Sequence, residues 1–575
     1  MTTPIDTKGS VRAWRLDDAQ RFLVLAVLIG VCTGLVVVCF HAAIELVDLS
    51  VRDTGRSSAM RVLWPAIGAA AAALIVRAIP VAAGSGIVQT KSALYVSNGH
   101  IPFAGVPGKF VACVLSIGTG TPLGPEDPAL LMGAGIASRL GRLFGLSQRS
   151  MRLIAPTGAA AGIAAAFNTP ITGVLFVLEE VVAGFDAAVM GSIVLAAASA
   201  VVTSRLFLGE SPLFSVPDVV PISQPGEVLV YVALGVAGGL FATAYVRMMS
   251  VLRYRLGAVR LPPAVGPLAA GLLVGVVALA WPDVLGTGYR AMDGALHSQY
   301  AWSTMATLAV VKCLVSGFAF GTGTPGGLFA PTLFLGVMLG GAFGGVAPWL
   351  PPGSQSAIVL AGMAAMFAGV FRAPMTAVFM AFELSGTAGS IVPAMIAATL
   401  AFLVARQLHR QSILDLVAEH EGANLPSARL ARPDAPLHVE DAMAAVPDSV
   451  VVLHASLDAA EVAATLEASP AAYGLVEASG GRWLVADREV LRSIAAEPAS
   501  WLELCRTPAP LQGTAASVHV VGPVYPDEWL DVALRQLATA PVVPVVSRLD
   551  GHRVVGVVTE TDVRTAYGRV HADRR

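Results

Sequence analysis

The chain has 575 residues, of which 55% are hydrophobic and 13% are charged, and its formal net charge is −2. A soluble domain carries roughly 25% charged residues, so about half of the expected charge is missing. This composition predicts a polytopic protein of the lipid bilayer, and a net charge so close to zero argues against a nucleic-acid partner.

A polar segment at residues 1–19 precedes the first apolar run, and we expect it to be a retained cytoplasmic tail. Apolar helices are expected from there to about residue 408, several of them too short to cross ~30 Å of bilayer alone. Short, interrupted helices at matching places in two halves are typical of transporter binding sites. The expected ranges are about 20–48, 61–79, 85–97, 108–118, 127–143, 149–166, 171–184, 187–207, 227–256, 264–281, 302–320, 328–347, 355–370, 374–386 and 388–408.

The sequence Gly-Thr-Gly-Thr-Pro occurs twice, at 118–122 and at 321–325, an offset of 203 residues (321 − 118). A lysine stands ahead of each copy at the same offset, Lys109 and Lys312. Fixed-offset similarity of this kind indicates a duplicated membrane domain.

A second pair of similar segments, 167–172 and 371–376, has an offset of 204 residues (371 − 167). The two repeats are expected at about 61–207 and 264–408. In transporters the substrate site usually lies where such repeats meet, near the bilayer midplane.

Four Gly/Pro-rich segments lie directly before or within these apolar runs. They are 84–87 (Gly-Ser-Gly-Ile), 124–128 (Gly-Pro-Glu-Asp-Pro), 165–170 (Ala-Ala-Phe-Asn-Thr-Pro) followed by Glu179-Glu180, and 327–331 (Gly-Leu-Phe-Ala-Pro). Together these segments resemble the motifs of the CLC family of chloride channels and chloride/proton antiporters, and the likeness covers about residues 20–420. The resemblance implies an all-α membrane domain of two inverted-topology repeats with short, broken helices. It also implies a homodimer in a prokaryotic plasma membrane, with one anion path in each subunit.

Helix starts after such breaks suit an anion, because they present unpaired backbone N–H groups and about half a positive charge. Several starts that converge near the midplane can hold a desolvated anion without a lysine or arginine. Close helix packing is the alternative explanation for the glycines. The expected anion-binding residues are Ser85, through its hydroxyl, and Gly86, Ile87, Leu328 and Phe329.

Two glutamates are expected to handle protons. The resemblance makes Glu126 the gate, whose carboxylate occupies the external anion site and swings away when protonated; a merely favourable acidic helix start is the alternative. The resemblance makes Glu180 the internal proton relay. Glu179 has a counterpart in Glu383 and is expected to be structural, whereas Glu180 aligns with Leu384. Plain surface charge at a helix end is the alternative for Glu180.

Three departures from the family pattern bear on gating, coupling and anion preference. Pro125 and Asp127 replace Arg and Gly in the second motif, and like-charge repulsion is expected between Asp127 and Glu126. The pair Val88-Gln89 follows the first motif where Pro-Glu is usual. Leu414 lies where the family commonly has a tyrosine, so it has no hydroxyl to donate to a central anion.

The composition becomes that of a soluble α/β domain beyond about residue 410. We expect a linker at 421–436 and a domain at 437–575. Strand-like and amphipathic runs alternate within it in two units of about 60 residues, 439–494 and 518–567.

The second of these units ends in Gly-Val-Val-Thr-x-x-Asp and resembles a CBS domain, so the pair resembles a cytoplasmic CBS tandem. The first unit is degenerate, with Val-Ala-Asp-Arg at 485–488 where Gly-x-x-Thr is expected. The resemblance implies that Thr559 and Asp562 bind the ribose of a nucleotide. The alternative is a tandem that packs beneath the pore without a ligand.

The resemblance therefore implies chloride/proton antiport, with chloride and protons as the partners. Retention of Glu126 and Glu180 favours antiport, while the leucine at position 414 favours the nearest alternative, a passive chloride channel. A CBS-regulated divalent-cation transporter and a nucleotide sensor with a membrane anchor are further alternatives. The chain is not expected to be an enzyme or to hold a metal, and the one cofactor considered is a nucleotide at the CBS pair.

Overall fold

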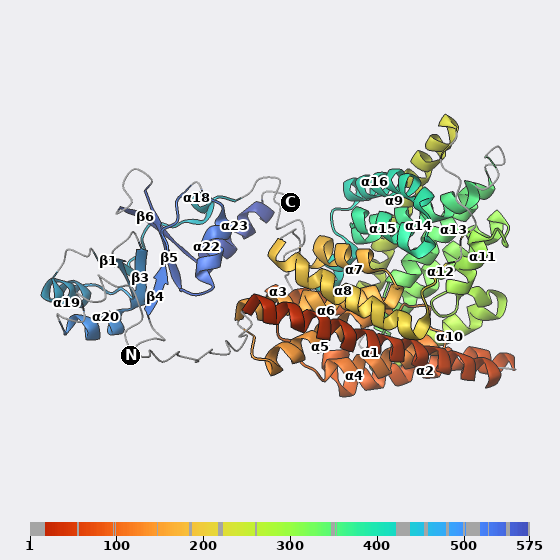
Figure 1. Cartoon of the computed structure of the whole chain (residues 1–575), viewed down its shortest axis with the longest axis horizontal. Helices are drawn as coiled ribbons and strands as arrows, with labels where there is room; N and C mark the ends of the chain where they lie inside the picture. Colours follow the sequence, from red (N-terminus) through yellow and green to blue (C-terminus); the bar gives the residue numbers. More distant parts are fainter. Residues whose placement is uncertain are drawn as a thin grey trace, which may run out of the picture. The chain divides into compact units, whose positions relative to one another are not determined.

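The chain divides into two units, Met1–Ala431 and Arg432–Arg575. In this computed structural model the first unit is helical and the second mixes helices and strands (Figure 1). The linker expected at 421–436 and most of the tail expected at 1–19 lie outside the described residues. The structure describes residues 18–572 except 55–56, 96, 98, 147, 183–186, 215, 217–221, 223, 259–261, 347–350, 352–353, 421–436, 454–457, 479–481, 498–500, 502–517, 527 and 548–552.

Every helix expected in the first unit forms, with ends that differ by a few residues, and α11 and α17 were not expected. Among the residues that the structure describes, seven helices are long and apolar enough to span a bilayer, as a multi-pass membrane protein requires. The helices are α1 (Asp18–Thr54), α2 (Ser58–Ala78), α3 (Gly86–Tyr95), α4 (Gly105–Gly118), α5 (Glu126–Leu143), α6 (Gln148–Phe167), α7 (Pro170–Phe176), α8 (Ala187–Leu208), α9 (Pro225–Ala258), α10 (Val265–Ala280), α11 (Tyr289–Leu296), α12 (Trp302–Gly321), α13 (Phe329–Gly345), α14 (Ser354–Phe371), α15 (Pro374–Ser385), α16 (Ile391–Leu408) and α17 (Ile413–His420).

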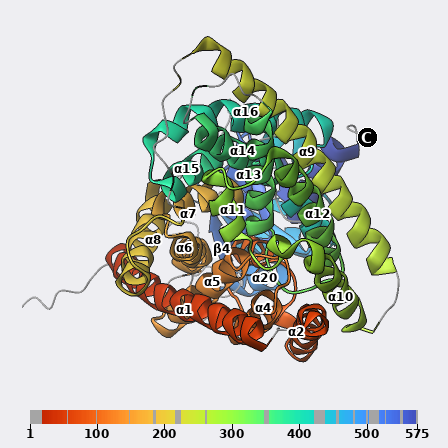
Figure 2. The same ribbon diagram turned by 90° about the vertical axis from the view of Figure 1, so that its right-hand side faces the viewer.

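Helices α1 to α8 correspond one to one with α9 to α16, as a duplicated domain predicts. Helix α1 packs against α4, α6 and α8, and α9 packs in the same way against α12, α14 and α16. Figure 2 shows α1 and α9 along the outside of this unit, with α11 and α13 between them. The packing therefore adds α1 and α9 as a matching pair ahead of the repeats expected at 61–207 and 264–408.

Glycines inside the central helices permit close helix packing at matching places in both repeats. A Cβ on Gly133 of α5 would collide with the carbonyl oxygen of Gly158 in α6. A Cβ on Gly336 of α13 would lie 2.6 Å from the carbonyl oxygen of Gly362 in α14. Helix α5 therefore packs closely on α6, and α13 on α14, at these four glycines, which lie outside the four Gly/Pro-rich motifs.

The second unit holds two halves that follow the same order of strands and helices. Its sheets run β1-β2-β3-β4 and β5-β6. The pair β1/β2 is parallel, and so is the bridge between Val524 and Val545 in the second half. The elements are α18 (Val439–Ala442), β1 (Val450–Leu453), α19 (Ala459–Ala468), β2 (Tyr473–Ala478), β3 (Arg482–Asp487), α20 (Arg488–Ala495), β4 (Val518–Val521), α22 (Leu530–Leu537), β5 (Val542–Val546), β6 (Val554–Thr559) and α23 (Glu560–Ala572).

The two halves exchange elements at their ends. Strand β4, which opens the second sequence unit, pairs antiparallel with β3 of the first. Val439 of α18, which opens the first unit, packs in one core with Val543 and Val558 of the second. The expected units 439–494 and 518–567 are therefore interleaved in space.

Candidate anion and proton site

The helix starts that the sequence assigns to an anion converge on one small cavity. Ser85 and Ile87 line it from the start of α3, and Leu328 and Phe329 line it from the start of α13. Gly86, between the first two, is the first residue of α3. None of the described residues that line the cavity is basic. The structure thus brings the five predicted residues together, and their binding of an anion stays a prediction.

Backbone hydrogen bonds join the two repeats beside this cavity. The N–H of Gly124 donates to the carbonyl of Gly327, and the N–H of Gly327 donates to the carbonyl of Gly124, both at 2.8 Å. The pairing is antiparallel, as expected for segments related by a twofold axis. The cavity therefore lies where the repeats meet, as the sequence predicts.

Glu126 is the first residue of α5, and its side chain is completely buried. Tyr289, the first residue of α11, donates its hydroxyl proton to Oε1 of this glutamate. A Cβ on Gly124 would collide with Oε2 and would lie 3.0 Å from the backbone nitrogen of Ala330. The carboxylate thus lies against Gly124 near the start of α13, and only glycine leaves room for it there.

Asp127 directs its carboxylate to the start of α3. Oδ1 accepts the hydroxyl of Ser85 and the N–H of Ile87, both at 3.0 Å, and Oδ2 accepts the N–H of Gly86 at 3.1 Å. Glu126 and Asp127 therefore have different partners, on α11 and α3. Like-charge repulsion was expected between these adjacent acids, and the fold gives each carboxylate its own hydrogen-bond donors.

Glu180 lies in a π-helical turn, Val177–Val181, that continues α7. It is 5% exposed and forms an ion pair with Lys91 of α3, with Nζ and Oε2 3.2 Å apart. Plain surface charge, the alternative explanation for Glu180, is therefore wrong. The same helix, α3, starts at the cavity and carries this lysine one to two turns further on.

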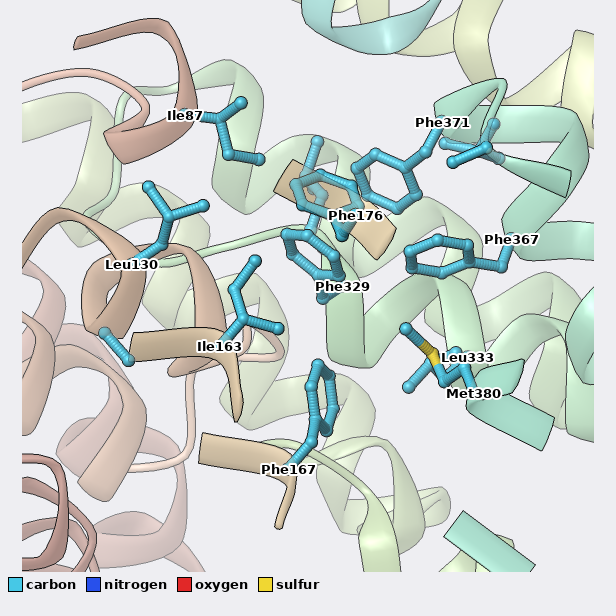
Figure 3. Packing of buried hydrophobic residues seen from close by; sticks show 14 of the residues in the cluster. Ile87, Leu130, Ile163, Phe167, Phe176, Phe329, Leu333, Phe367, Phe371 and Met380 are labelled. Carbon is cyan, nitrogen blue, oxygen red and sulfur yellow. The ribbon is translucent and has the colours of Figure 1, made fainter. Parts of the chain in front are cut away.

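Aromatic side chains pack behind Phe329. Its ring stacks on that of Phe371 with centroids 4.7 Å apart, and the centroid of Phe176 lies 4.9 Å away. Figure 3 shows these rings together with Phe367, while Phe167 approaches from the opposite side. This packing fixes Phe329 and so positions the start of α13 at the cavity.

Leu414, near the start of α17, lines the same cavity. Its apolar side chain lies there without a hydroxyl. Ser412 and Asp415 cap α17 reciprocally, with Ser412 N to Asp415 Oδ2 at 3.0 Å and Asp415 N to Ser412 Oγ at 3.1 Å. The leucine is therefore held at the cavity by an ordered helix start.

Residues 67–406 match the family described as voltage gated chloride channel. That is 340 of 575 residues (406 − 67 + 1), more than half of the chain. The chain belongs to the CLC family.

CLC relatives with different names resemble this chain to a similar degree. The H(+)/Cl(-) exchange transporter ClcA of Vibrio vulnificus is 29% identical over 393 residues, which cover 65% of this chain and 84% of ClcA. The voltage-gated ClC-type chloride channel ClcB of Salmonella typhimurium is 29% identical over 418 residues, which cover 70% of this chain and all of ClcB.

Solved CLC structures share the fold. The structure of a slow cyanobacterial Cl-/H+ antiporter is 25% identical, with a TM-score of 0.64. The match covers 72% of this chain and 99% of the antiporter chain. The structure of a eukaryotic CLC transporter is 18% identical, with a TM-score of 0.66. The match covers 94% of this chain and 98% of the transporter chain. The second likeness shows the fold alone and extends beyond the membrane helices.

Glu179 of the first repeat caps the start of α15 in the second, and Glu383 of the second repeat caps the start of α7 in the first. The structural prediction for Glu179 requires such a role. The carboxylate of Glu179 accepts the N–H groups of Met375 and Thr376, at 3.1 and 2.8 Å, and the Thr376 hydroxyl. In the same way Glu383 accepts the N–H groups of residues 171 and 172, at 3.0 and 2.7 Å, and the hydroxyl of Thr172. The structural prediction for Glu179 is confirmed.

Glu179→Gln and Glu383→Gln are expected to lower the melting temperature of the detergent-purified protein by several degrees and by similar amounts. Each change removes the charge from a carboxylate that accepts three hydrogen bonds, and bonds to charged groups contribute roughly 1.5–3 kcal/mol. Glu210→Gln, an exposed glutamate after α8, is the matched control and should leave the melting temperature unchanged. Unequal effects of the first two variants would contradict equivalent roles in the two repeats.

The sequence reasoning missed Tyr289 and Lys91, two partners of its proton residues. The repeat offset contained the signal for Tyr289, because residue 86, where α3 starts, plus 203 gives 289, where α11 starts. For Lys91 the signal was a charge in an apolar helix next to a predicted site.

The two residues assigned to a nucleotide bond to each other at the start of α23. The hydroxyl of Thr559 donates to Oδ2 of Asp562 at 2.6 Å, and its backbone N–H donates to the same oxygen at 2.9 Å. This arrangement caps the helix, and nucleotide binding stays a prediction.

Proposed function

We propose that this protein exchanges chloride for protons across a lipid bilayer. The observation that carries the proposal is one small cavity at the repeat interface, lined by helix starts, and a buried glutamate at the first position of α5, directly before the lining residue Asp127. Helix starts attract an anion while leaving it free to depart, and an intramembrane acid supplies a proton site. Similarity to proteins named as Cl-/H+ antiporters supports the same conclusion.

Chloride binds at the cavity through backbone N–H groups and one hydroxyl. The donors are the Ser85 hydroxyl and the amides of Gly86, Ile87, Leu328 and Phe329. These residues are buried, so the anion is desolvated and its interaction with each donor is strengthened.

Protons pass through two buried acids. Glu126 is the gate: while ionised it accepts the Tyr289 hydroxyl beside the start of α13, and when protonated it turns away and leaves room for chloride. Glu180 is the internal relay, and its carboxylate is paired with Lys91 of α3, the helix that starts at the cavity. Glu126 belongs to α5 and Glu180 is paired with α3, and both helices begin at the cavity, which ties proton movement to anion movement.

A passive chloride channel is the second candidate. Leu414 favours it, because an apolar side chain at the cavity cannot donate a hydrogen bond to the central anion. The name of ClcB, a voltage-gated chloride channel, also fits this candidate.

The reversal potential of the full chain in liposomes separates the two candidates. With equal chloride on both sides and a pH gradient, an antiporter develops a nonzero reversal potential, whereas a channel stays at zero. We expect a shift that grows with the pH gradient. A reversal potential that follows chloride alone would establish the channel, and absence of chloride flux would reject both.

The assembly is a homodimer in a prokaryotic plasma membrane, with 20–420 as the membrane domain and 1–19 and 437–575 in the cytoplasm. Residues 437–575 form a CBS pair joined by the linker 421–436, and two halves with the same strand order support this assignment. Thr559 and Asp562 are the candidate ribose contacts. Binding of a fluorescent adenine nucleotide to wild type but not to Asp562→Ala tests them.

A further inference from the structure

Asp127 occupies the hydrogen-bond donors at the start of α3. Its two oxygens accept all three groups there that were assigned to the anion, the Ser85 hydroxyl and the N–H groups of Gly86 and Ile87, at 3.0 to 3.1 Å. Asp127 is 4% exposed and lines the cavity together with Leu328 and Phe329. A monovalent anion of the chain is therefore already bound where the transported anion is expected.

The fold holds this carboxylate in place from two sides. Asp127 is the second residue of α5, which points its side chain across to α3, and a Cβ on Gly327 would lie 2.8 Å from the Cβ of Asp127. The neighbouring Glu126 cannot take the same donors while it accepts Tyr289 at α11. The consecutive acids thus serve two equivalent helices of the two repeats, α3 and α11.

We propose that Asp127 is a tethered competitor of the transported anion: chloride binds the donors of α3 only when the Asp127 carboxylate is displaced. The proposal rests on the proposed function of the cavity as an anion site. A carboxylate and a chloride cannot share the same three donors, and a competitor fixed in the chain cannot diffuse away. If the carboxylate occupies the donors nine-tenths of the time, the apparent Kd for chloride rises about tenfold.

Chloride titration of the detergent-purified full chain by calorimetry tests the proposal. Asp127→Asn keeps the size of the side chain and removes its charge, and Asp127→Gly removes the side chain. Both are expected to bind chloride about tenfold more tightly than wild type. Glu227→Gln is the matched control, because it removes an equal charge from a buried acid in the first turn of α9 that does not line the cavity, and it should leave the Kd unchanged.

Equal Kd values in wild type and Asp127→Asn would overturn the proposal and leave the anion site intact. Equal tightening by Glu227→Gln would also overturn it, since the effect would then be one of general charge. Absence of chloride binding in every variant would instead reject the proposed function.

Anomalous diffraction from bromide-soaked crystals gives a second measurement. In Asp127→Asn we expect density in contact with the Ser85 hydroxyl, and in wild type at the same bromide concentration we expect density only near Leu328 and Phe329. Equal density beside Ser85 in both proteins would contradict the competition.

Discussion

Glu126→Gln is expected to abolish proton transport and to leave chloride flux that no longer depends on pH. The glutamine has nearly the shape of the protonated acid. Because it carries no charge at any pH, it cannot return as an anion to the start of α13. Chloride efflux and proton uptake, measured together in liposomes at several pH values, check this result.

Two variants serve as controls for Glu126. Glu227→Gln changes another buried glutamate, which accepts the N–H of Gln224 at 3.0 Å at the start of α9, and should retain proton transport. Tyr289→Phe removes the hydroxyl and keeps the acid, so it should still couple protons to chloride. Wild-type proton transport by Glu126→Gln would remove Glu126 from the mechanism.

The repeats explain how much of this site was predictable. Two copies of one pentapeptide located both helix starts that meet at the Gly124–Gly327 bridge, because a duplicated fold repeats its geometry at a fixed offset. The offset of 204 residues in the second pair of segments distinguished Glu179, whose twin is Glu383 (383 − 179), from Glu180, which has none. Local sequence and periodicity were sufficient for these elements.

The side-chain partners could not be predicted in the same way. Asp127 lies beside Glu126 in sequence, and like-charge repulsion was the natural expectation for two adjacent acids. The fold instead gives Asp127 the donors of α3, 41 residues away at Gly86. Lys91 and Glu180 are 89 residues apart and meet only because α3 packs against α6 and the turn after α7. Pairing across the chain depends on tertiary packing, which a single sequence does not reveal.

Glu180→Gln is expected to abolish proton coupling while chloride flux continues. Glu180 is buried in a π-helical turn that its twin helix α15 lacks, and an amide at this position cannot carry a proton toward the cavity. Leu384 occupies the equivalent place in the second repeat, so the fold itself does not require an acid there. Proton uptake should fall to that of empty liposomes while chloride efflux remains.

Because Glu180 forms a buried ion pair with Lys91, the experiment needs a second variant in which both charges are removed. Glu180→Gln alone leaves the Lys91 ammonium buried without its counter-charge, which is costly and lowers the folded yield. The double variant Glu180→Gln with Lys91→Met removes both charges, so it should fold better and be equally uncoupled. Glu179→Gln is the matched control, because it changes the adjacent acid and should lose stability but keep its proton-to-chloride ratio. A wild-type proton-to-chloride ratio in both Glu180 variants would place the proton path elsewhere, because neither variant has an acid at position 180.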